Sequence, residues 1–384
     1  MGSVEVVEVS LPRETERFVR TWFTIYENEP SWVPPLYFER KRWFDPARNP
    51  YFDDARPAYF IASRDGRDVG TIGVSIDGAY QAHEPGTAFF GFFEFVDDVE
   101  VARALLGAAR EWLIDQGMNR AIGPFNFTTN HEFALIVDGF DEPPMVANPW
   151  NARWYPGIYE AIGLTKAMDW YAYHCDADMP GMQKMIKVAN RLVSRNPDLV
   201  IRSLDMKRWE EDVEKVRGIY RDAWEQNWAH VRVSDREFDF IAGGLKQLID
   251  PDLCFIAEVG GAVAGISVTL PDFNQVVHRM NGRILPFGWI HVLRKKQLMN
   301  RVRIFMLGVS QEFQNLPLGA ALYAKTFEVA LAKGYRYGEA SLILENNHRM
   351  RGALEKMGAV IDKTYRNYEI DLQPGAVGTK EGAP

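Results

Sequence analysis

Apolar and polar positions alternate most clearly in the last third of the chain, where they predict an ordered run of strands and helices. Residues 304–309 form a short apolar run with the length of a buried strand. After a polar loop, apolar residues recur at helical spacing as far as Lys333 and Gly334, a base followed by a helix-ending glycine. Further elements are expected at 337–344 (strand), 347–356 (helix) and 364–370 (strand). Strands that alternate with helices predict an α/β fold.

The N-terminal half shows the same order of expected elements with little residue identity. We therefore expect two α/β domains in tandem, at 1–178 and 199–372, each with a central mixed twisted sheet flanked by helices. A helical linker is expected at 179–198. The tail at 373–384 is poor in apolar residues and is expected to be disordered.

Composition narrows the class of protein. The 384 residues carry a net charge of −8, which argues against nucleic acid as a partner. Cys175 and Cys254 are far apart and lack metal-site spacing, so we expect no metal and a reducing, cytoplasmic location. The first residues do not have the pattern of a targeting peptide, and no run approaches the roughly 20 apolar residues that span a membrane.

The loop between the apolar strand and the helix that follows is a candidate anion site. A helix N-terminus favours an anion because its first backbone N–H groups lack partners, and this geometry suits a pyrophosphate. The loop resembles the Gln/Arg-x-x-Gly-x-Gly/Ala phosphate loop of the GNAT acyltransferase superfamily at Gln314 and Gly319, with Pro317 in place of the first glycine. The pattern that follows in that family, an asparagine and then Lys-x-Gly, is met at Asn347 and Gly358.

The resemblance implies that acyl-CoA is a co-substrate and that no cofactor is bound permanently. It also implies that Leu354 stands in place of the tyrosine that often serves as general acid. The N-terminal copy has only the stretch from Asp97 to Glu100 in place of the loop; because these carboxylates would repel a pyrophosphate, we expect that copy to be degenerate. The expected cofactor-binding residues are Leu307, Gly308, Val309, Gln314, Leu318, Gly319, Ala320 and Asn347.

A long loop in the N-terminal half carries further motifs. The runs Gly-Pro-Phe-Asn, ending at Asn126, and Asp-Gly-Phe-Asp, ending at Asp141, resemble a bacterial branch of double-GNAT proteins, as does Glu-x-Ser at 339–341. Some members of that branch are regarded as ceramide synthases, which acylate the amine of a sphingoid base. His131 is a candidate catalytic residue in this loop, and Asn126 and Glu132 are candidate substrate ligands. The alternative is that the loop caps the sheet and that His131 bonds to backbone.

Alternation in the penultimate strand places Glu339, Ser341 and Glu345 on one face. Buried carboxylates are costly unless they meet water, a partner or a substrate, so we expect Glu339 and Ser341 to contact substrate. Glu345, at the strand end, is the candidate base that takes a proton from the attacking amine, with a salt bridge to Arg349 or Arg366 as the alternative.

Two more side chains are candidates on less direct grounds. Glu94 lies among Phe92, Phe93 and Phe95 in sequence and is a candidate substrate ligand. Tyr365, in the last strand, is a candidate donor of the proton that the leaving thiolate takes up, with simple packing as the alternative.

The segment 284–296 begins at Ile284 with apolar residues and ends in the bases Arg294, Lys295 and Lys296. Such a segment could cover an apolar acyl channel or meet anionic lipid headgroups at a membrane surface. The alternative is a helix packed across the sheet edge with its basic end in water. The segment favours a long acyl chain or a lipid acceptor.

Together these features predict an acyl-CoA-dependent N-acyltransferase that moves the acyl group directly to an amine, without a covalent enzyme intermediate. The sequence contains neither HExxH nor GxSxG, so it gives no support to metal or serine hydrolase chemistry. Two alternatives stay open at this point: aminoacyl transfer from tRNA, and a non-catalytic protein that binds acyl-CoA or lipid. The acceptor, the acyl length and the oligomeric state are not specified by the sequence.

Overall fold

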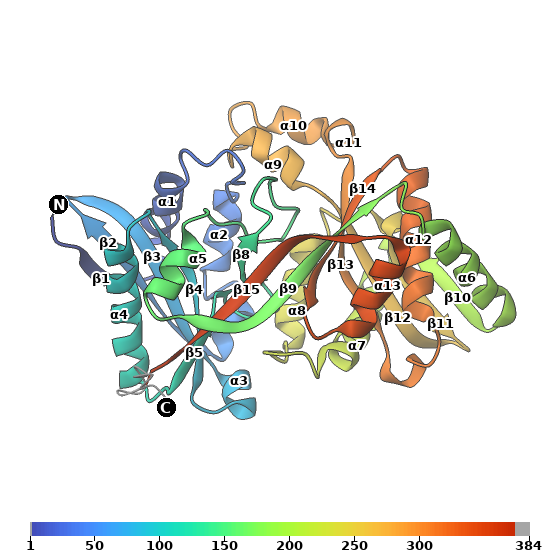
Figure 1. The fold of residues 1–384 in the computed structure, drawn as a ribbon, viewed down its shortest axis with the longest axis horizontal. Helices are drawn as coiled ribbons and strands as arrows, with labels where there is room; N and C mark the ends of the chain where they lie inside the picture. The colour runs from blue at the N-terminus through green and yellow to red at the C-terminus, as the bar shows by residue number, and fades with distance from the viewer. Residues whose placement is uncertain (1, 373–384) are drawn as a thin grey trace, which may run out of the picture.

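A single mixed sheet runs through both halves of the molecule. The computed structural model describes residues 2–372, so the expected tail lies outside the described residues. Thirteen strands of the described chain form this sheet, in the order β1-β2-β3-β4-β5-β15-β9-β14-β13-β12-β11-β10, with β8 paired to β15. The α/β class with helices flanking a mixed sheet is confirmed (Figure 1).

The elements follow the expected alternation of strands and helices. The strands are β1 Glu5–Val9, β2 Ala55–Arg64, β3 Arg67–Asp77, β4 Thr87–Phe95, β5 Arg120–Gly123, β6 Phe125–Asn126, β7 Glu132–Phe133, β8 Leu135–Asp138, β9 Thr165–Asp176, β10 Leu199–Ser203, β11 Cys254–Val259, β12 Ala262–Pro271, β13 Arg301–Val309, β14 Tyr337–Leu344 and β15 Val360–Asp371. The helices are α1 Thr15–Ile25, α2 Tyr37–Trp43, α3 Gly78–His83, α4 Val99–Asp115, α5 Tyr155–Ala161, α6 Met182–Arg195, α7 Trp209–Trp224, α8 Asp235–Leu245, α9 Asn274–Met280, α10 Trp289–Leu293, α11 Lys295–Leu298, α12 Leu318–Ala332 and α13 His348–Met357. Short 3₁₀ turns are η1 Pro50–Asp53, η2 Met206–Arg208, η3 Pro251–Leu253 and η4 Gln311–Phe313.

The two halves of the sheet are joined by an exchange of their last strands. Strand β9, the last strand before the linker helix α6, pairs with β14 of the C-terminal half. Strand β15, the last strand of the chain, pairs with β5 of the N-terminal half and with β9. In Figure 1 these two long strands run side by side across the centre. The boundaries proposed near residues 178 and 199 therefore divide the sequence but do not interrupt the sheet.

Helix α12 is buried against the C-terminal half of the sheet and ends at a glycine. Eight of its residues are buried, because it packs against β12 and β13 on one side and against α6 on another. Its chain turns away after Lys333, where Gly334 adopts φ 90°, a left-handed conformation that glycine takes without a steric penalty. Helix α13 ends in the same way at Gly358, with φ 96°.

The start of α4 differs from the start of α12. Asp98 accepts hydrogen bonds from the backbone N–H groups of Glu100 and Val101, and Arg64 pairs with the carboxylates of Asp98 and Glu100. The first N–H groups of α4 are thus satisfied by the chain itself. No helix among residues 2–372 is long and apolar enough to cross a membrane.

Candidate active site

The central strands β13 and β14 separate where the site begins. Their parallel ladder runs from Arg301 opposite Tyr337 to Ile304 opposite Ala340. Beyond that point β13 continues to Val309 against β12, while β14 continues against β9. Irregularities of register, between Val268 and Thr269 on the β12 side and between Ala340 and Ile343 on the β9 side, accompany the divergence. The gap can therefore admit an extended chain between two strand edges.

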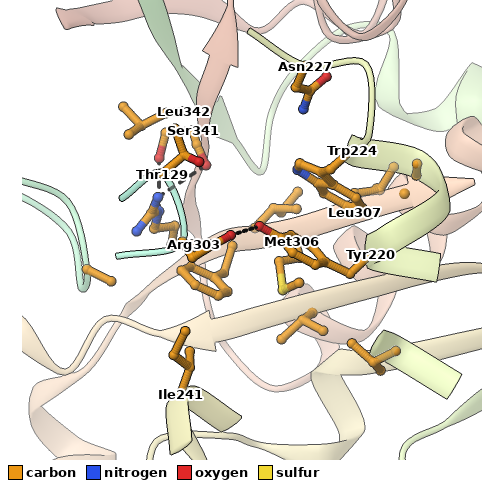
Figure 2. A pocket seen from close by; sticks show the side chains of 18 of the residues that line it. Thr129, Tyr220, Trp224, Asn227, Ile241, Arg303, Met306, Leu307, Ser341 and Leu342 are labelled. Carbon is orange, nitrogen blue, oxygen red and sulfur yellow. Dashed lines mark hydrogen bonds between the residues drawn. The ribbon is translucent and has the colours of Figure 1, made fainter. Parts of the chain in front are cut away.

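A largely apolar cavity of about 260 Å³ opens beside this gap. It lies between the diverging strands, helices α7 and α8, and the loops around residues 129–133 and 227–233. Trp224 of α7 packs directly on β13, since a Cβ atom built at Gly308 would lie 2.3 Å from its ring. Figure 2 shows Arg303 and Ser341 across the cavity from Tyr220 and Trp224.

Three of the expected cofactor-binding residues, Leu307, Gly308 and Asn347, line this cavity. Asn347 also caps α13, because its side-chain oxygen accepts a hydrogen bond from the backbone N–H of Met350 at 3.1 Å. The side chain of Val309 approaches the first turn of α12: its Cγ2 lies 4.0 Å from a Cβ built at Gly319. The end of β13 and the start of α12 thus meet at one edge of the gap.

The N-terminus of α12 keeps its first backbone donors available. No side chain in the described part of the chain caps this helix, and the backbone N–H of Ala321 bonds to Pro317 at 3.1 Å. The amides of Leu318, Gly319 and Ala320 lie before that bond, where helical N–H groups have no partner within the helix. Gln314 is held by Arg349 of α13, which donates to its backbone oxygen and, at 3.2 Å, to its side chain. A cation therefore stands beside this uncapped helix end.

Glu339 and Ser341 meet a buried polar network next to the cavity. The hydroxyl of Ser341 donates to Glu339 at 2.6 Å and accepts from Nε of Arg303 at 3.0 Å. Asn148 donates to both Glu339 and Ser341. Lys363 lies 3.3 Å from the other Glu339 oxygen, and both side chains are almost fully buried. Burial lowers the pKa of Arg303 to about 10, which still leaves its guanidinium charged at neutral pH. Arg303 and Lys363 are therefore two cations in the same network as Glu339.

Within this network Arg303 and Ser341 reach the cavity wall, while Glu339 lies behind them. Tyr365 is also behind the wall and fully buried, and its hydroxyl has no hydrogen-bond partner among residues 2–372. Burial and the charge of Glu339 raise the pKa of Tyr365 well above its usual value. The network can therefore orient a polar group of a bound molecule through Ser341 and Arg303.

His131 lines the cavity from the long loop of the N-terminal half. Its Nδ1 lies 3.3 Å from the hydroxyl of Thr128, and its Nε2 lies 3.9 Å from Oε1 of Glu237 on α8. Neither Nε2 nor Oε1 has a hydrogen-bond partner among the described residues. Burial lowers the pKa of His131 to about 3, so its imidazole is neutral. Burial, with the nearby charge of Asp77, raises the pKa of Glu237 to about 7.

Tyr323 of α12 is a second unpartnered polar group at the cavity. Its side chain is 1% exposed and lines the cavity wall. Its hydroxyl has no hydrogen-bond partner among residues 2–372. Burial raises the pKa of Tyr323, so the phenol keeps its proton at neutral pH and can act as a hydrogen-bond donor.

The structure places Glu345 away from the cavity wall. Its carboxylate lies 2.8 Å from Nζ of Lys166 and accepts a hydrogen bond from the backbone N–H of Asp169 at 3.2 Å. Glu345 therefore forms a salt bridge, as the alternative prediction had it, but its partner is Lys166 of β9 and not Arg349 or Arg366.

The other N-terminal candidates gather in the core of their own half. Tyr26 and Tyr155 both donate to Glu94, and burial raises the pKa of Glu94 to about 7. Asn126 accepts a backbone hydrogen bond at 2.7 Å and donates to Glu132 at 3.3 Å. These residues are not among the described side chains that line the cavity.

Several cavity residues were not singled out from the sequence. Tyr323 and Arg303, which line the cavity, and Glu237, which lies behind His131, occupy ordinary helix and strand positions, so periodicity alone gives no reason to select them. The sequence does offer one signal for a site at the end of α7. There Trp224 and Trp228 flank polar residues, and a connection between two helices is rarely so rich in aromatic residues. Among residues 2–372 no group of three or more acidic, histidine or cysteine side chains is placed to hold a metal ion.

Known proteins place this geometry in context. No protein-family model matches the chain. A protein named bacterial ceramide synthase from Caulobacter vibrioides is 35% identical over 97% of this chain and 98% of its own length. The protein YghO from Escherichia coli is 31% identical over 94% of this chain and 93% of its own length.

Solved structures agree on the fold. A tandem GNAT protein from the clavulanic acid biosynthesis pathway superposes with a TM-score of 0.57, covers 97% of this chain and all of its own, and is 13% identical. A GCN5-related N-acetyltransferase from Sphaerobacter thermophilus gives a TM-score of 0.51 over 96% of each chain, at 12% identity. Given the separated central strands, the shared fold and the full-length identity, this chain belongs to the bacterial double-GNAT family that includes the Caulobacter ceramide synthase and YghO.

Proposed function

We propose that this protein transfers an acyl group from acyl-CoA to the amine of a long-chain, sphingoid-base-like lipid. The observation that carries the proposal is the divergence of β13 and β14 beside an uncapped helix N-terminus and an apolar cavity. Each part has a separate use: the gap for the extended arm of the thioester, the helix end for its diphosphate, and the cavity for apolar chains.

The donor would lie along β13. The strand edge near Leu307, Gly308 and Val309 would offer main-chain groups to an extended arm, while the missing side chain of Gly308 lets the Trp224 ring pack on the strand. The amides of Leu318, Gly319 and Ala320 would hold the diphosphate, with the Arg349 guanidinium nearby. Pro317 supplies no N–H of its own, so this cradle has one donor fewer than the usual glycine loop.

The acceptor would enter from the side of α7 and α8. The cavity wall there is formed by large apolar side chains, including Trp209, Val216, Leu245 and Ile249. A wall of this kind stabilises a hydrocarbon chain by about 0.8 kcal/mol for each buried methylene. The Caulobacter relative is named as a ceramide synthase, and ceramide formation is the N-acylation of a long-chain amine.

Acyl transfer joins the amine nitrogen to the thioester carbonyl carbon, breaks the carbon–sulfur bond, and moves one proton from the amine and one to the thiolate. We assign the first proton to the pair formed by His131 and Glu237. Neutral His131 would accept the proton, and the Glu237 carboxylate, 3.9 Å from its Nε2, would stabilise the imidazolium that results. Tyr323, which lines the cavity, would give the second proton, in the role for which the family motif has a tyrosine and this chain has Leu354.

The test has two stages. Calorimetry of the full chain with acetyl-, octanoyl- and palmitoyl-CoA should show binding that strengthens with acyl length, and mass spectrometry should then detect an N-acyl product and free CoA when sphinganine is added. No binding to any of the three thioesters would overturn the proposal. Binding without product for any long-chain amine would instead assign a role as an acyl-CoA carrier.

A further inference from the structure

One exposed surface of the protein carries large apolar side chains and basic side chains together. We call residues 274–298, from the start of α9 to the end of α11, the upper-edge segment, after its place in Figure 1. On its inner side, Ile284, Val292 and Leu298 pack against the small core around Val276 and Met280 of α9. Val33 and Leu36 of the N-terminal half pack against the same core. The segment is therefore anchored by its own set of apolar side chains.

A second set of apolar side chains on the same segment faces outward. Phe287 is 71% exposed and Leu293 is 75% exposed, although both are large and hydrophobic. The others in this set are Leu285, Trp289 and Ile290. Because the inner side already anchors the segment, these outward side chains are not needed for its packing. Clustered exposure of this kind marks an interaction surface.

The same surface is basic, although the protein as a whole is acidic. Between Asp272 and Glu312 the sequence contains no acidic residue, although the whole chain carries 52 acids and a net charge of −8. The bases Arg283, Arg294 and Lys296 are exposed, and none of them has an ion-pair partner within residues 2–372. The remaining cations of the segment are Arg279 and Lys295.

We propose that the upper-edge segment docks the protein onto an anionic lipid bilayer. Exposed Phe, Leu, Ile and Trp side chains would enter the headgroup region, where indole rings are favoured, and the unpaired cations would meet lipid phosphates. A second copy of this chain fits less well, because a symmetric contact would bring two basic patches together. No side chain of residues 284–296 is among those that line the cavity in the described chain, so the segment does not cover that site.

The experiment is vesicle sedimentation of the full-length protein, without substrates. Wild type should bind vesicles that contain phosphatidylglycerol, bind phosphatidylcholine vesicles more weakly, and lose the difference at high salt. Lys295→Gln/Lys296→Gln should weaken binding to the anionic vesicles by about 5-fold for each charge removed. Phe287→Ser/Leu293→Ser should weaken binding to both kinds of vesicle by about 10-fold or more.

Two matched controls separate this surface from general effects. Lys184→Gln/Lys187→Gln removes two exposed cations from α6, and Val200→Ser removes an exposed apolar side chain from β10; both should bind vesicles as wild type does. Equal binding by wild type and the upper-edge variants, or no binding of wild type to any vesicle, would overturn the proposal. So would self-association that only Phe287→Ser/Leu293→Ser abolishes. The outcome is independent of acyl transfer, since vesicle binding is measured on the protein alone.

Discussion

Replacing Glu237 with glutamine should raise stability while it lowers activity. Burial raises the pKa of this carboxyl from an ordinary 4.5 to about 7. In the unfolded chain the carboxyl is ionised above 4.5, whereas in the folded protein it keeps its proton up to about 7. The folded state therefore binds more protons in that interval, and the free energy of unfolding falls as the pH rises through it. Glutamine has no proton to lose, so it removes this dependence.

The size of the effect follows from the same interval. Each pH unit is equivalent to about 1.4 kcal/mol for one proton, so the range from pH 5 to pH 7 accounts for about 3 kcal/mol. Relative to wild type, Glu237→Gln should thus gain about 3 kcal/mol between pH 5 and pH 8. Asp272, whose pKa is also raised by burial, contributes equally to both proteins and cancels in the comparison. The charge of Asp77 acts on Glu237 and is already part of the raised pKa of Glu237.

The assay is urea denaturation followed by circular dichroism at pH 5 and pH 8. Glu210→Gln, which changes an exposed carboxylate on α7 to the same amide, should follow wild type at both values. The rate of N-acyl product formation, measured alongside, should fall by about 100-fold in Glu237→Gln and should lose its rise near pH 7. A stability difference that is the same at both pH values would refute the titration of Glu237 in the fold, and an unchanged rate would refute its role in stabilising protonated His131.

Three further changes test other parts of the site. Gly308→Val should drive a side chain into Trp224, destabilise the fold by about 1–3 kcal/mol, and weaken acyl-CoA binding in calorimetry because the displaced Trp224 ring disturbs the cavity. Glu339→Gln should remove the carboxylate that faces the buried cations Arg303 and Lys363, leaving Lys363 with Asp362 alone. The free energy of unfolding in urea should fall by about 3 kcal/mol, whereas an unchanged midpoint would show that the network relaxes. Tyr323→Phe should lower kcat by about 100-fold with the same acyl-CoA affinity; a change in affinity alone would assign the hydroxyl to binding.

Much of the fold was predictable because its strands and helices follow from the local spacing of apolar residues. The C-terminal strands and helices, and the glycines that end α12 and α13, follow from patterns that span fewer than about 20 residues. The exchange of β9 and β15 could not be read in this way. It depends on pairings between residues far apart in the chain, such as Tyr337 with Asp176 and Tyr368 with Gly123, which no local pattern specifies.

The short range of sequence patterns also explains which site residues could be predicted. Alternation along β14 put Glu339, Ser341 and Glu345 on one face, and it holds for the first two. The register of β14 against β9 shifts between Ala340 and Ile343, so the two-residue period does not carry through to Glu345. Glu237 could be paired with His131 only in three dimensions, since they come from different halves of the chain.

The crossed last strands have a consequence for how the molecule can be divided. If the backbone were cut within α6, the first fragment would hold β5 and β9 without the strand that lies between them, and the second would hold β14 and β15 with the same kind of vacancy. In the first piece β9 would lose both of its neighbours and β5 and β8 one each, and in the second β15 would lose every partner and β14 one. Only the other piece fits these exposed strand edges. A nicked molecule should therefore stay whole in solution and come apart only on global unfolding, so the duplicated halves behave as one inseparable cooperative unit.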